Sequence, residues 1–348
     1  MSHNKHYPMQ FTGRGAEYFK IWIVNIALTL LTLGIYSAWA KVRTLRWFYG
    51  HTLLDDQAFS YLASPMQILK GRLIALAALA AYYTASFFAP MLALALLALF
   101  FVFLPWIVVN SLRFRARQSA YRSLRFDFTG KIGEAAFIYL LLPVLLLPTF
   151  GLILPYMAHR QVKFIAENTV YGETTARYQG SLKPFWSVYL LSFVLLLLPL
   201  AIMAYGTYQA YVMQAAGMPK EAATAAAGSF MLAGMGAFYL AILVASALVQ
   251  ARTVNILYNG TDLGPVGFVS TQRARDLMWL YLSNLVLIAF TLGLFIPWAK
   301  VRMARYSAQR LTVAGPQELN SFVAGQHQTS TATGAEMADL FDLNIGLT

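Results

Sequence analysis

Residues that could do chemistry are few in this chain, and they stand apart from one another. His51 and His159 are isolated, and the other three histidines lie near the termini. The sequence has no His-x-x-x-His pair, no Gly-x-Ser-x-Gly and no glycine-rich phosphate loop. Because it also lacks cysteine, thiolate metal sites and cysteine nucleophiles are excluded. We therefore expect a protein that is not an enzyme and that has no cofactor or metal site.

Three acidic residues share the same spacing to an arginine, which follows each of them by 26 residues. The acids are Glu17, Glu134 and Asp276, and their arginines are Arg43, Arg160 and Arg302. A straight helix of that length would separate the two charges by about 39 Å. If the segment turns back, a bidentate arginine–carboxylate contact can close it. The alternative is that the acids favour helix N-termini, and both interpretations remain open.

These charges belong to a 31-residue pattern that recurs three times, and repeats of this kind set the architecture of a chain. Each copy has Thr-x-Gly at its centre and an aromatic residue five positions after the glycine. These positions are Thr32, Gly34 and Trp39, then Thr149, Gly151 and Tyr156, then Thr291, Gly293 and Trp298. Asn25 and Asn284 lie nine residues before the glycines of the first and third copies, where we expect hydrogen bonds between helices.

Composition predicts a membrane protein. Charged residues make up 11% of the chain, against about 25% in soluble domains. Residues 73–112 carry no charge, and because a span needs about 20 apolar residues, we expect two spans joined by a turn near Pro90. Residues 184–213 and 229–250 are two further candidates, and the centres of the repeat copies bring the total to seven apolar segments.

Short polar stretches after the basic clusters are typical of β-hairpins, because turn residues lie between aromatic and β-branched residues. The expected hairpins are 51–61 with Asp55-Asp56, 168–179 with Gly172-Glu173, 258–270 with Asn259-Gly260 and Gly264-Pro265, and 311–322 with Gly315-Pro316. Residues 122–129 and 10–13 are expected to form single strands. Open sheet edges cannot lie in lipid, so these elements are expected outside the bilayer.

The net charge of +12 is concentrated beside the apolar segments, as in Lys41 and Arg43 after the first. This bias marks the cytoplasmic side of membrane proteins and predicts contact with anionic headgroups. Without an accompanying RNA- or DNA-binding motif, it does not indicate a nucleic-acid partner.

If all seven segments crossed the membrane, the basic ends of the repeat copies would lie on opposite faces. The conflict disappears if each copy enters, turns at Thr-x-Gly and leaves on the same side, as re-entrant segments do. Pro143, Pro148 and Pro155 interrupt the second copy, and Pro297 follows the turn of the third. Ordinary spans, arranged as inverted repeats, are the alternative.

The expected fold is a mainly α-helical, polytopic membrane protein. It combines re-entrant or broken repeat helices and helical hairpins with short β-hairpins that form a cytoplasmic layer. The predicted divisions are module 1 at residues 8–125, module 2 at 126–265, a third repeat copy at 266–323 and a flexible tail at 324–348.

Two stretches resemble the signature of the YjgN family of bacterial inner-membrane proteins. They are Gly-Ile-Tyr-Ser-Ala-Trp-Ala-Lys-Val-Arg at 34–43 and Gly-Leu-Phe-Ile-Pro-Trp-Ala-Lys-Val-Arg at 293–302. Asn168-Thr169 and Asn259-Gly-Thr261 extend the resemblance, which covers residues 8–323. It implies a polytopic inner-membrane protein of unknown function and assigns no catalytic or ligand residue. The chain departs from the signature at Gly50-His51-Thr52 and at Tyr156.

The predicted function is non-catalytic. The protein would organise lipid, or hold an unidentified protein partner, through cytoplasmic hairpins, with both termini in the cytoplasm. The alternative is a small-solute transporter or channel, because helix ends and unwound backbone build ion sites in broken helices. Against transport, the four long apolar segments carry no charge that could couple to an ion or a proton.

Overall fold

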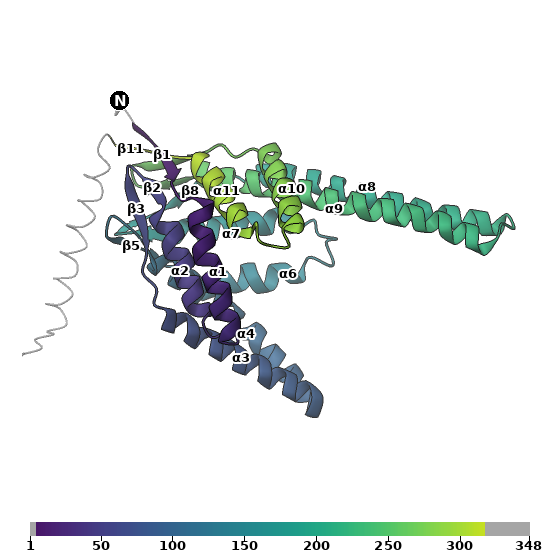
Figure 1. Cartoon of the computed structure of the whole chain (residues 1–348), viewed down its shortest axis with the longest axis horizontal. Helices are drawn as coiled ribbons and strands as arrows, with labels where there is room; N and C mark the ends of the chain where they lie inside the picture. The colour runs from purple at the N-terminus through teal and green to yellow at the C-terminus, as the bar shows by residue number, and fades with distance from the viewer. Residues whose placement is uncertain (1–4, 317–348) are drawn as a thin grey trace, which may run out of the picture.

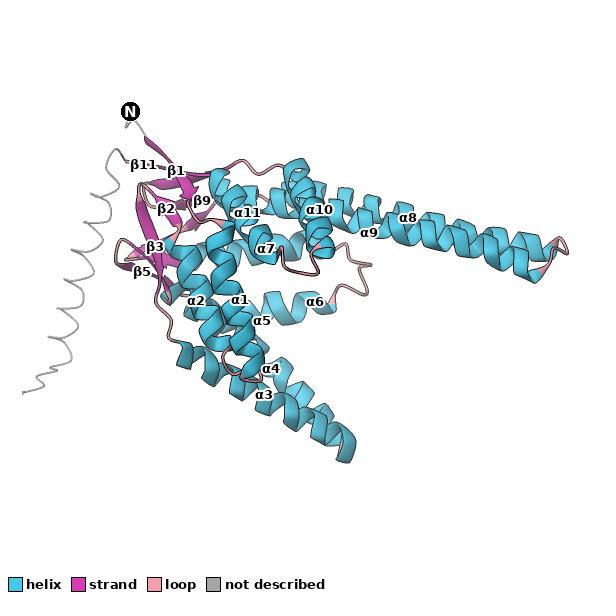
Figure 2. Ribbon diagram, viewed as in Figure 1, coloured by secondary structure: helices cyan, strands magenta, loops and turns pink. Residues whose placement is uncertain are grey.

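The computed structural model describes residues 5–316, and the predicted tail at 324–348 lies outside the described residues. Strands gather at one end of the molecule and helices run away from them (Figure 1, Figure 2). The strands are β1 Lys5–Phe11, β2 Thr52–Leu54, β3 Gln57–Tyr61, β4 Ser119–Tyr121, β5 Leu124–Phe128, β6 Thr169–Tyr171, β7 Thr174–Thr175, β8 Arg177–Tyr178, β9 Thr261–Leu263, β10 Val266–Ser270 and β11 Leu311–Gly315.

The described strands form one antiparallel sheet that closes on itself. Its order is β7-β6-β5-β4-β3-β2-β1-β11-β10-β9-β8. The two strands at the ends of this order, β7 and β8, are separated in the chain by Ala176 alone. The segment 174–178 therefore pairs with β6 through its first half and with β9 through its second half. This segment turns the sheet into a barrel, and the pairing of β1 with β11 joins the two ends of the chain in it.

A helical hairpin connects each strand that leaves the barrel to the next strand that enters it. The helices are α1 Gly15–Leu31, α2 Ser37–Gly50, α3 Pro65–Phe88, α4 Pro90–Arg117, α5 Ile132–Ala136, the π-helical turn η1 Phe137–Leu141, α6 Leu142–Val144, α7 Leu154–Glu167, α8 Lys183–Ala215, α9 Lys220–Asn259, α10 Ala274–Phe290 and α11 Ile296–Gln309. Within residues 5–316 this gives five hairpins, namely α1–α2, α3–α4, α5–α7, α8–α9 and α10–α11.

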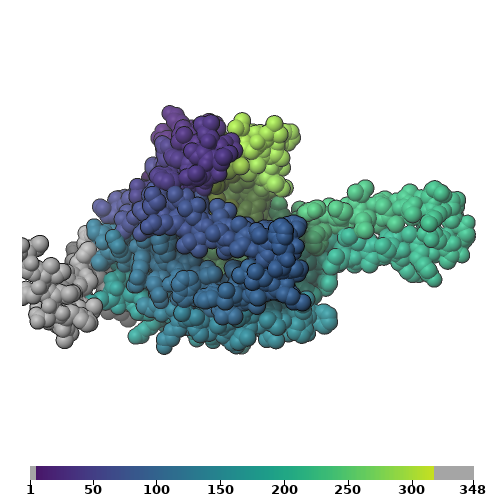
Figure 3. Space-filling model, turned by 90° about the horizontal axis from the view of Figure 1, so that it is seen from below, coloured from purple at the N-terminus to yellow at the C-terminus, as the bar shows by residue number. Residues whose placement is uncertain are grey.

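Neighbouring hairpins in the chain also contact one another, through α2 and α3, α4 and α5, α7 and α8, and α9 and α10. The first and last hairpins meet through α1 and α11. Seen from below, the α8–α9 pair projects beyond the rest of the molecule (Figure 3). Among the described helices, α3, α4, α8 and α9 are long and apolar enough to cross a membrane.

One hydrogen bond recurs at every junction between helices and barrel. The residue after each outgoing strand donates its N–H to the carbonyl that ends the neighbouring helix. The donor–acceptor pairs are Thr12–His51, Leu62–Gln118, Thr129–Asn168, Gln179–Gly260 and Thr271–Arg310, with N···O distances of 3.0, 2.9, 2.9, 2.7 and 2.9 Å. The described chain is thus built from five equivalent units, each a helical hairpin followed by two antiparallel strands, which in the last unit are β11 and, from the opposite end of the chain, β1. The three-copy pattern in the sequence marks only the units with short helices.

The short hairpins confirm that the repeat copies turn back at Thr-x-Gly. In each, the glycine N–H bonds to the carbonyl five residues earlier, with N···O distances of 2.8, 2.9 and 2.8 Å for Gly34, Gly151 and Gly293. The preceding residue is left-handed, with φ of 49° at Leu33, 49° at Phe150 and 48° at Leu292. This is the Schellman ending of a helix, with a large apolar residue at the position that glycine usually occupies.

The predicted β-hairpins at 51–61 and 168–179 are present. Asp55 and Asp56 form a turn with φ of 49° and 56°, which matches the twist of the strands they join. At 258–270 the turn is Gly264-Pro265, whereas Asn259-Gly260 ends α9. Module boundaries at 125 and 265 stay a prediction, because strands from all three divisions share the one sheet.

The strand predicted at 122–129 is present as β5, and it forms a hairpin with β4, which was not predicted. The hairpin predicted at 311–322 is described only as far as residue 316, and residues 317–322 lie outside the described residues. Its first strand, β11, pairs with β1 on one edge and with β10 on the other, so its hairpin partner is a strand from the opposite end of the chain.

We expect Gly34→Ala to lower the thermal stability of the purified protein. A methyl group there meets nothing within 4 Å, so the loss would come from the backbone, at φ +91°, and would amount to about 1–2 kcal/mol. Gly71→Ala in α3 is the matched control, because its surroundings are equally open and its conformation is helical. The Gly71→Ala variant should have a free energy of unfolding higher than that of the wild type by about 0.5–1 kcal/mol. Equal effects in thermal unfolding would contradict the assigned turn.

Candidate functional site

The threonines of the three turns close the helices. The Thr32 hydroxyl donates to the carbonyl of Leu28 at 2.7 Å and accepts the N–H of Tyr36 at 2.9 Å. Thr291 makes the same two bonds in the last hairpin, at 2.7 and 3.0 Å. Thr149 donates to Leu145 at 2.5 Å. These side chains therefore hold the turn together, and Gly34, Gly151 and Gly293 complete it.

Asn25 and Asn284 face the helix that returns after the turn, as their spacing predicts. The Arg302 guanidinium donates to Asn284 Oδ1 at 2.6 Å and to Ser283 Oγ at 3.0 Å. Asn25 Nδ2 lies 3.4 Å from the carbonyl of Ala40, while its buried Oδ1 has no hydrogen-bond partner among the described residues. Arg43, the equivalent of Arg302, is exposed instead.

The predicted acid–arginine contacts form in one copy of three. Arg160 meets Glu134 at 3.3 Å. In the third copy Asp276 pairs with Arg310 at 2.8 Å and not with Arg302. No ion pair in the described part of the chain joins Glu17 to Arg43, and both are exposed.

The 26-residue pairing, one of the two interpretations of these acids, does not form in the third copy for a geometric reason. In a hairpin, a residue faces the one that lies equally far beyond the turn. Asp276 lies 17 residues before Gly293 and Arg310 lies 17 after it, whereas Arg302 lies only 9 after it, opposite Asn284. In the second copy Arg160 reaches Glu134 although the spacing is equally uneven, where the π-helical turn η1 interrupts the first helix.

The repeated aromatic residues differ in their contacts. Trp298 lies against Phe19 of α1, with ring centroids 5.0 Å apart, and so joins the last hairpin to the first. Trp39 stacks on Tyr36 at 6.2 Å. Tyr156 is half-buried on α7. Their positions fit helix packing and do not converge on a common site.

A set of side chains locks the helices to the barrel, and the three-copy sequence pattern contains only its members Arg46, Lys163 and Arg305. Each lies five residues before the residue that ends its helix and donates to a carbonyl at the end of an outgoing strand. The donor and acceptor residues are Arg46 and Ala63 at 3.1 Å, Arg113 and Phe128 at 3.1 Å, Asn255 and Gln272 at 2.9 Å, and Arg305 and Gly13 at 3.0 Å. Lys163 holds the equivalent place in the third unit. Their constant distance from the helix end is the signal that could have revealed them.

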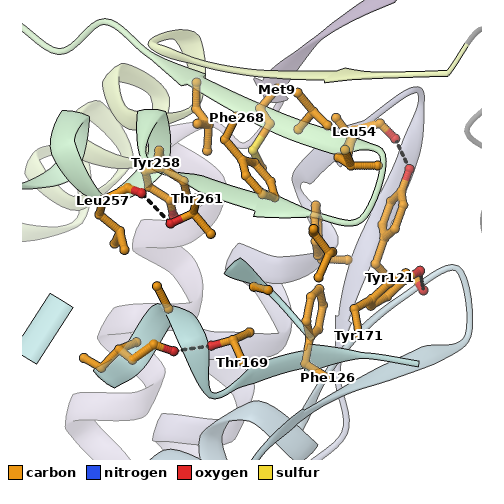
Figure 4. A pocket seen from close by; sticks show the side chains of 18 residues that line it. Met9, Leu54, Tyr121, Phe126, Thr169, Tyr171, Leu257, Tyr258, Thr261 and Phe268 are labelled. Carbon is orange, nitrogen blue, oxygen red and sulfur yellow. Dashed lines mark hydrogen bonds between the residues drawn. The ribbon is translucent and has the colours of Figure 1, made fainter. Parts of the chain in front are cut away.

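The barrel encloses a cavity of about 400 Å³ (Figure 4). Its wall is almost entirely carbon and includes Met9, Phe59, Phe126 and Phe268. The hydroxyl of Tyr171 donates to the carbonyl of Tyr121 at 3.0 Å. Burial raises the pKa of the phenols of Tyr121 and Tyr171, so both stay neutral at physiological pH. The cavity therefore offers shape and apolar contact, with no charge.

Residues able to hold a metal ion do not cluster anywhere in the described part of the chain. His51 Nδ1 lies 2.7 Å from the carbonyl of Trp47, and its ring packs on that indole at 4.4 Å. His159 packs against Phe185 and Tyr178. Both histidines thus have packing roles.

The chain belongs to a bacterial protein family of unknown function, described as "Bacterial protein of unknown function (DUF898)", which it matches over residues 6–340. It is 31% identical over 129 residues to the protein named "Inner membrane protein YjgN" of Salmonella typhimurium, covering 36% of this chain and 32% of that protein. The protein of the same name from Escherichia coli strain K12 is 32% identical over 119 residues, with coverage of 34% and 30%. The chain thus aligns with about a third of the length of the curated relatives it matches. No solved structure matches it significantly.

We expect Asp276→Arg and Arg310→Asp each to lower stability, and the double variant to recover most of the loss. The pair is about three-quarters buried at the acid, and a coupling of about 0.5–1 kcal/mol is typical of such contacts. Asp276→Arg combined with Arg302→Asp is the control, in which recovery is not expected. Double-mutant cycles of thermal unfolding in detergent measure the coupling in both combinations. Recovery in the control, or none with Arg310, would contradict the assigned pairing.

Proposed function

We propose that this protein is a non-catalytic, multi-pass inner-membrane protein whose hairpins all enter the bilayer from the cytoplasmic face. The turn residues carry this proposal. Leu33 and Leu292 are 95% exposed and Phe150 is 84% exposed, each in a left-handed conformation that glycine would adopt at lower cost. A large apolar side chain at such a position stabilises the protein only where its surroundings are also apolar. The tips of the short hairpins would therefore lie in lipid.

The charge distribution supports one orientation. Cations are concentrated in the helical turns nearest the barrel, and the sequences at the tips 29–37, 86–92, 145–153 and 288–296 carry no charge. Only the α8–α9 loop has charged residues at its tip, Lys220 and Glu221. Since positive charge favours the cytoplasmic side, the barrel and both ends of the described chain would lie in the cytoplasm.

Because the hairpins differ in length, they would enter the bilayer to different depths. Helix α8 has 33 residues and is about 50 Å long, more than the hydrocarbon thickness of about 30 Å. Helix α1 has 17 residues, about 25 Å, part of which lies beside the barrel. Arg72 lies seven residues after the start of α3, and its side chain donates to the hydroxyl of Ser37, the first residue of α2 after the tip of the first hairpin. Because a cation belongs near the headgroups, the first hairpin would enter one leaflet only.

The function that follows is the organisation of lipid around a cytoplasmic barrel. Exposed cations such as Lys20, Arg43 and Lys300 surround the helices near the barrel, and each contributes about 1 kcal/mol near an anionic surface. The barrel would then present a folded surface and an apolar cavity at the membrane, where a protein partner could also bind. The relatives' name, inner membrane protein, agrees with this location.

The alternative is transport of a small solute along the hairpins. It is favoured by a hollow of about 330 Å³ between α1, α2 and α11, lined by Asn25, Thr29, Thr44 and Lys300. The unpartnered Oδ1 of Asn25 is an acceptor there. Solute flux into vesicles that contain the purified protein would favour this alternative over lipid organisation.

Single cysteines test the orientation, since the chain has none of its own. We expect Gln57→Cys and Thr175→Cys, on the barrel, to be protected from an impermeant thiol reagent in intact cells and to react after permeabilisation. Ala216→Cys, at the tip of α8–α9, should react in intact cells. Leu292→Cys should stay unreactive in both, because lipid would cover it.

Reaction at Thr175 with protection at Gln57 would contradict insertion from one face, since both positions lie on the same barrel. Ready reaction at Leu292 after permeabilisation would place that tip in water and remove the argument for re-entrant hairpins.

A further inference from the structure

The barrel cavity exists because one of its equivalent inward positions carries a small residue. In the described sheet, this position lies two residues before the end of each outgoing strand. Four units place a large side chain there, namely Met9, Phe59, Phe126 and Phe268, paired opposite Leu54, Tyr121, Tyr171 and Val313. The remaining unit places Ala176 there, in the segment that closes the sheet. A barrel of this size has more interior than short side chains fill, so the missing ring leaves space.

Four of the hydroxyls on the cavity wall, those of Tyr121, Thr169, Tyr171 and Thr261, are hydrogen-bonded to backbone carbonyls of the protein itself. The hydroxyls of Thr169 and Thr261 donate to the carbonyls of Ile165 and Leu257 at 2.7 and 2.6 Å. The Tyr121 hydroxyl donates to the carbonyl of Leu54 at 2.8 Å. Figure 4 shows these bonds pointing along the wall, between carbon surfaces. No charged side chain lines the cavity, so its wall complements an aliphatic ligand better than a charged one.

The cavity reaches the helices on one side. Its lining includes the last turns of α7 and α9, through Ile165, Ala166, Leu257 and Tyr258. Of these, Ile165 is 36% exposed. We infer that the mouth lies on this side, where the helices meet the barrel.

We propose that the barrel binds a single aliphatic chain, of a fatty acid or of a membrane lipid, inserted between α7 and α9 into the space left by Ala176. The volume of about 400 Å³ lies in the range of about 300–1,000 Å³ typical of small-molecule sites. Apolar cavities of this kind stay dry and take up apolar molecules. The proposal deepens the proposed lipid-organising function, but the cavity does not depend on which face of the membrane the barrel occupies.

The test uses the purified full chain in lipid nanodiscs with two photoreactive probes. One is palmitic acid with a diazirine near its methyl end, and the other is phosphatidylglycerol that carries the same chain. After irradiation, peptides are mapped by mass spectrometry, with excess oleate as competitor. Labelling of the strands within 166–178 and 261–268, reduced by oleate, is expected. The probe that labels identifies a free fatty acid or a lipid chain as the occupant.

Ala176→Phe should reduce this labelling at least tenfold, because it supplies a large side chain like those that the other units carry. Ala58→Phe is the matched control, since Ala58 is exposed on the outside of β3, and labelling should be unchanged. The double variant Ala176→Phe/Phe126→Ala should restore the labelling, because removal of the Phe126 ring frees the volume that the new ring occupies. The restored labelling also shows that loss in the single variant is not a failure to fold.

Labelling confined to the outer faces of the helices would overturn the proposal. So would equal labelling of the wild type and Ala176→Phe, or loss of labelling in Ala58→Phe. None of these results bears on the cysteine reactions that test the orientation, so failure of one proposal is distinguishable from failure of the other.

Discussion

Closure of the sheet is the constraint on which the rest of this structure depends. The segment 174–178 divides its hydrogen bonds between β6 and β9, and strands from the two ends of the described chain, β1 and β11, pair with each other. A closed sheet has no free edge, and every helical hairpin must then begin and end at the same barrel. The turn back within each repeat copy follows from this closure, as do the shared junction bonds.

The closed sheet also explains where the chain accepts backbone strain. A short helix that must return to the barrel needs a tight turn, and Leu33, Phe150 and Leu292 adopt a left-handed conformation to make it. The apolar exposure of these residues links the geometry of the barrel to membrane insertion. Likewise, Arg46, Arg113 and Arg305 donate to carbonyls at the junction, whereas Arg43 is exposed.

Much of the helical framework could be predicted from sequence, because apolar length and the break at Pro90 are local signals. Family membership followed from the Trp-Ala-Lys-Val-Arg motifs. The fivefold pattern could not be found in the same way, since the helical hairpins differ in length and separate the equivalent residues Thr52, Ser119, Thr169 and Thr261 by unequal distances. The pairing of β1 with β11 joins residues about 310 apart, which no local pattern encodes. The partner of Asp276 was missed because the sequence interpretation used the repeated 26-residue spacing. In a hairpin, the partner is the residue that lies equally far beyond the turn.

Disulfide trapping across β1 and β11 tests closure most directly. His6 and Ala314 lie opposite each other in the register, and the chain has no other cysteine to interfere. In the His6→Cys/Ala314→Cys variant, mild oxidation should join the two ends, so that fragments cut by a protease in the α8–α9 loop stay together until reduced. His6→Cys/Ala58→Cys, on strands that do not pair, should give no such product. Fragments that separate without reduction in the first variant would contradict the closed barrel.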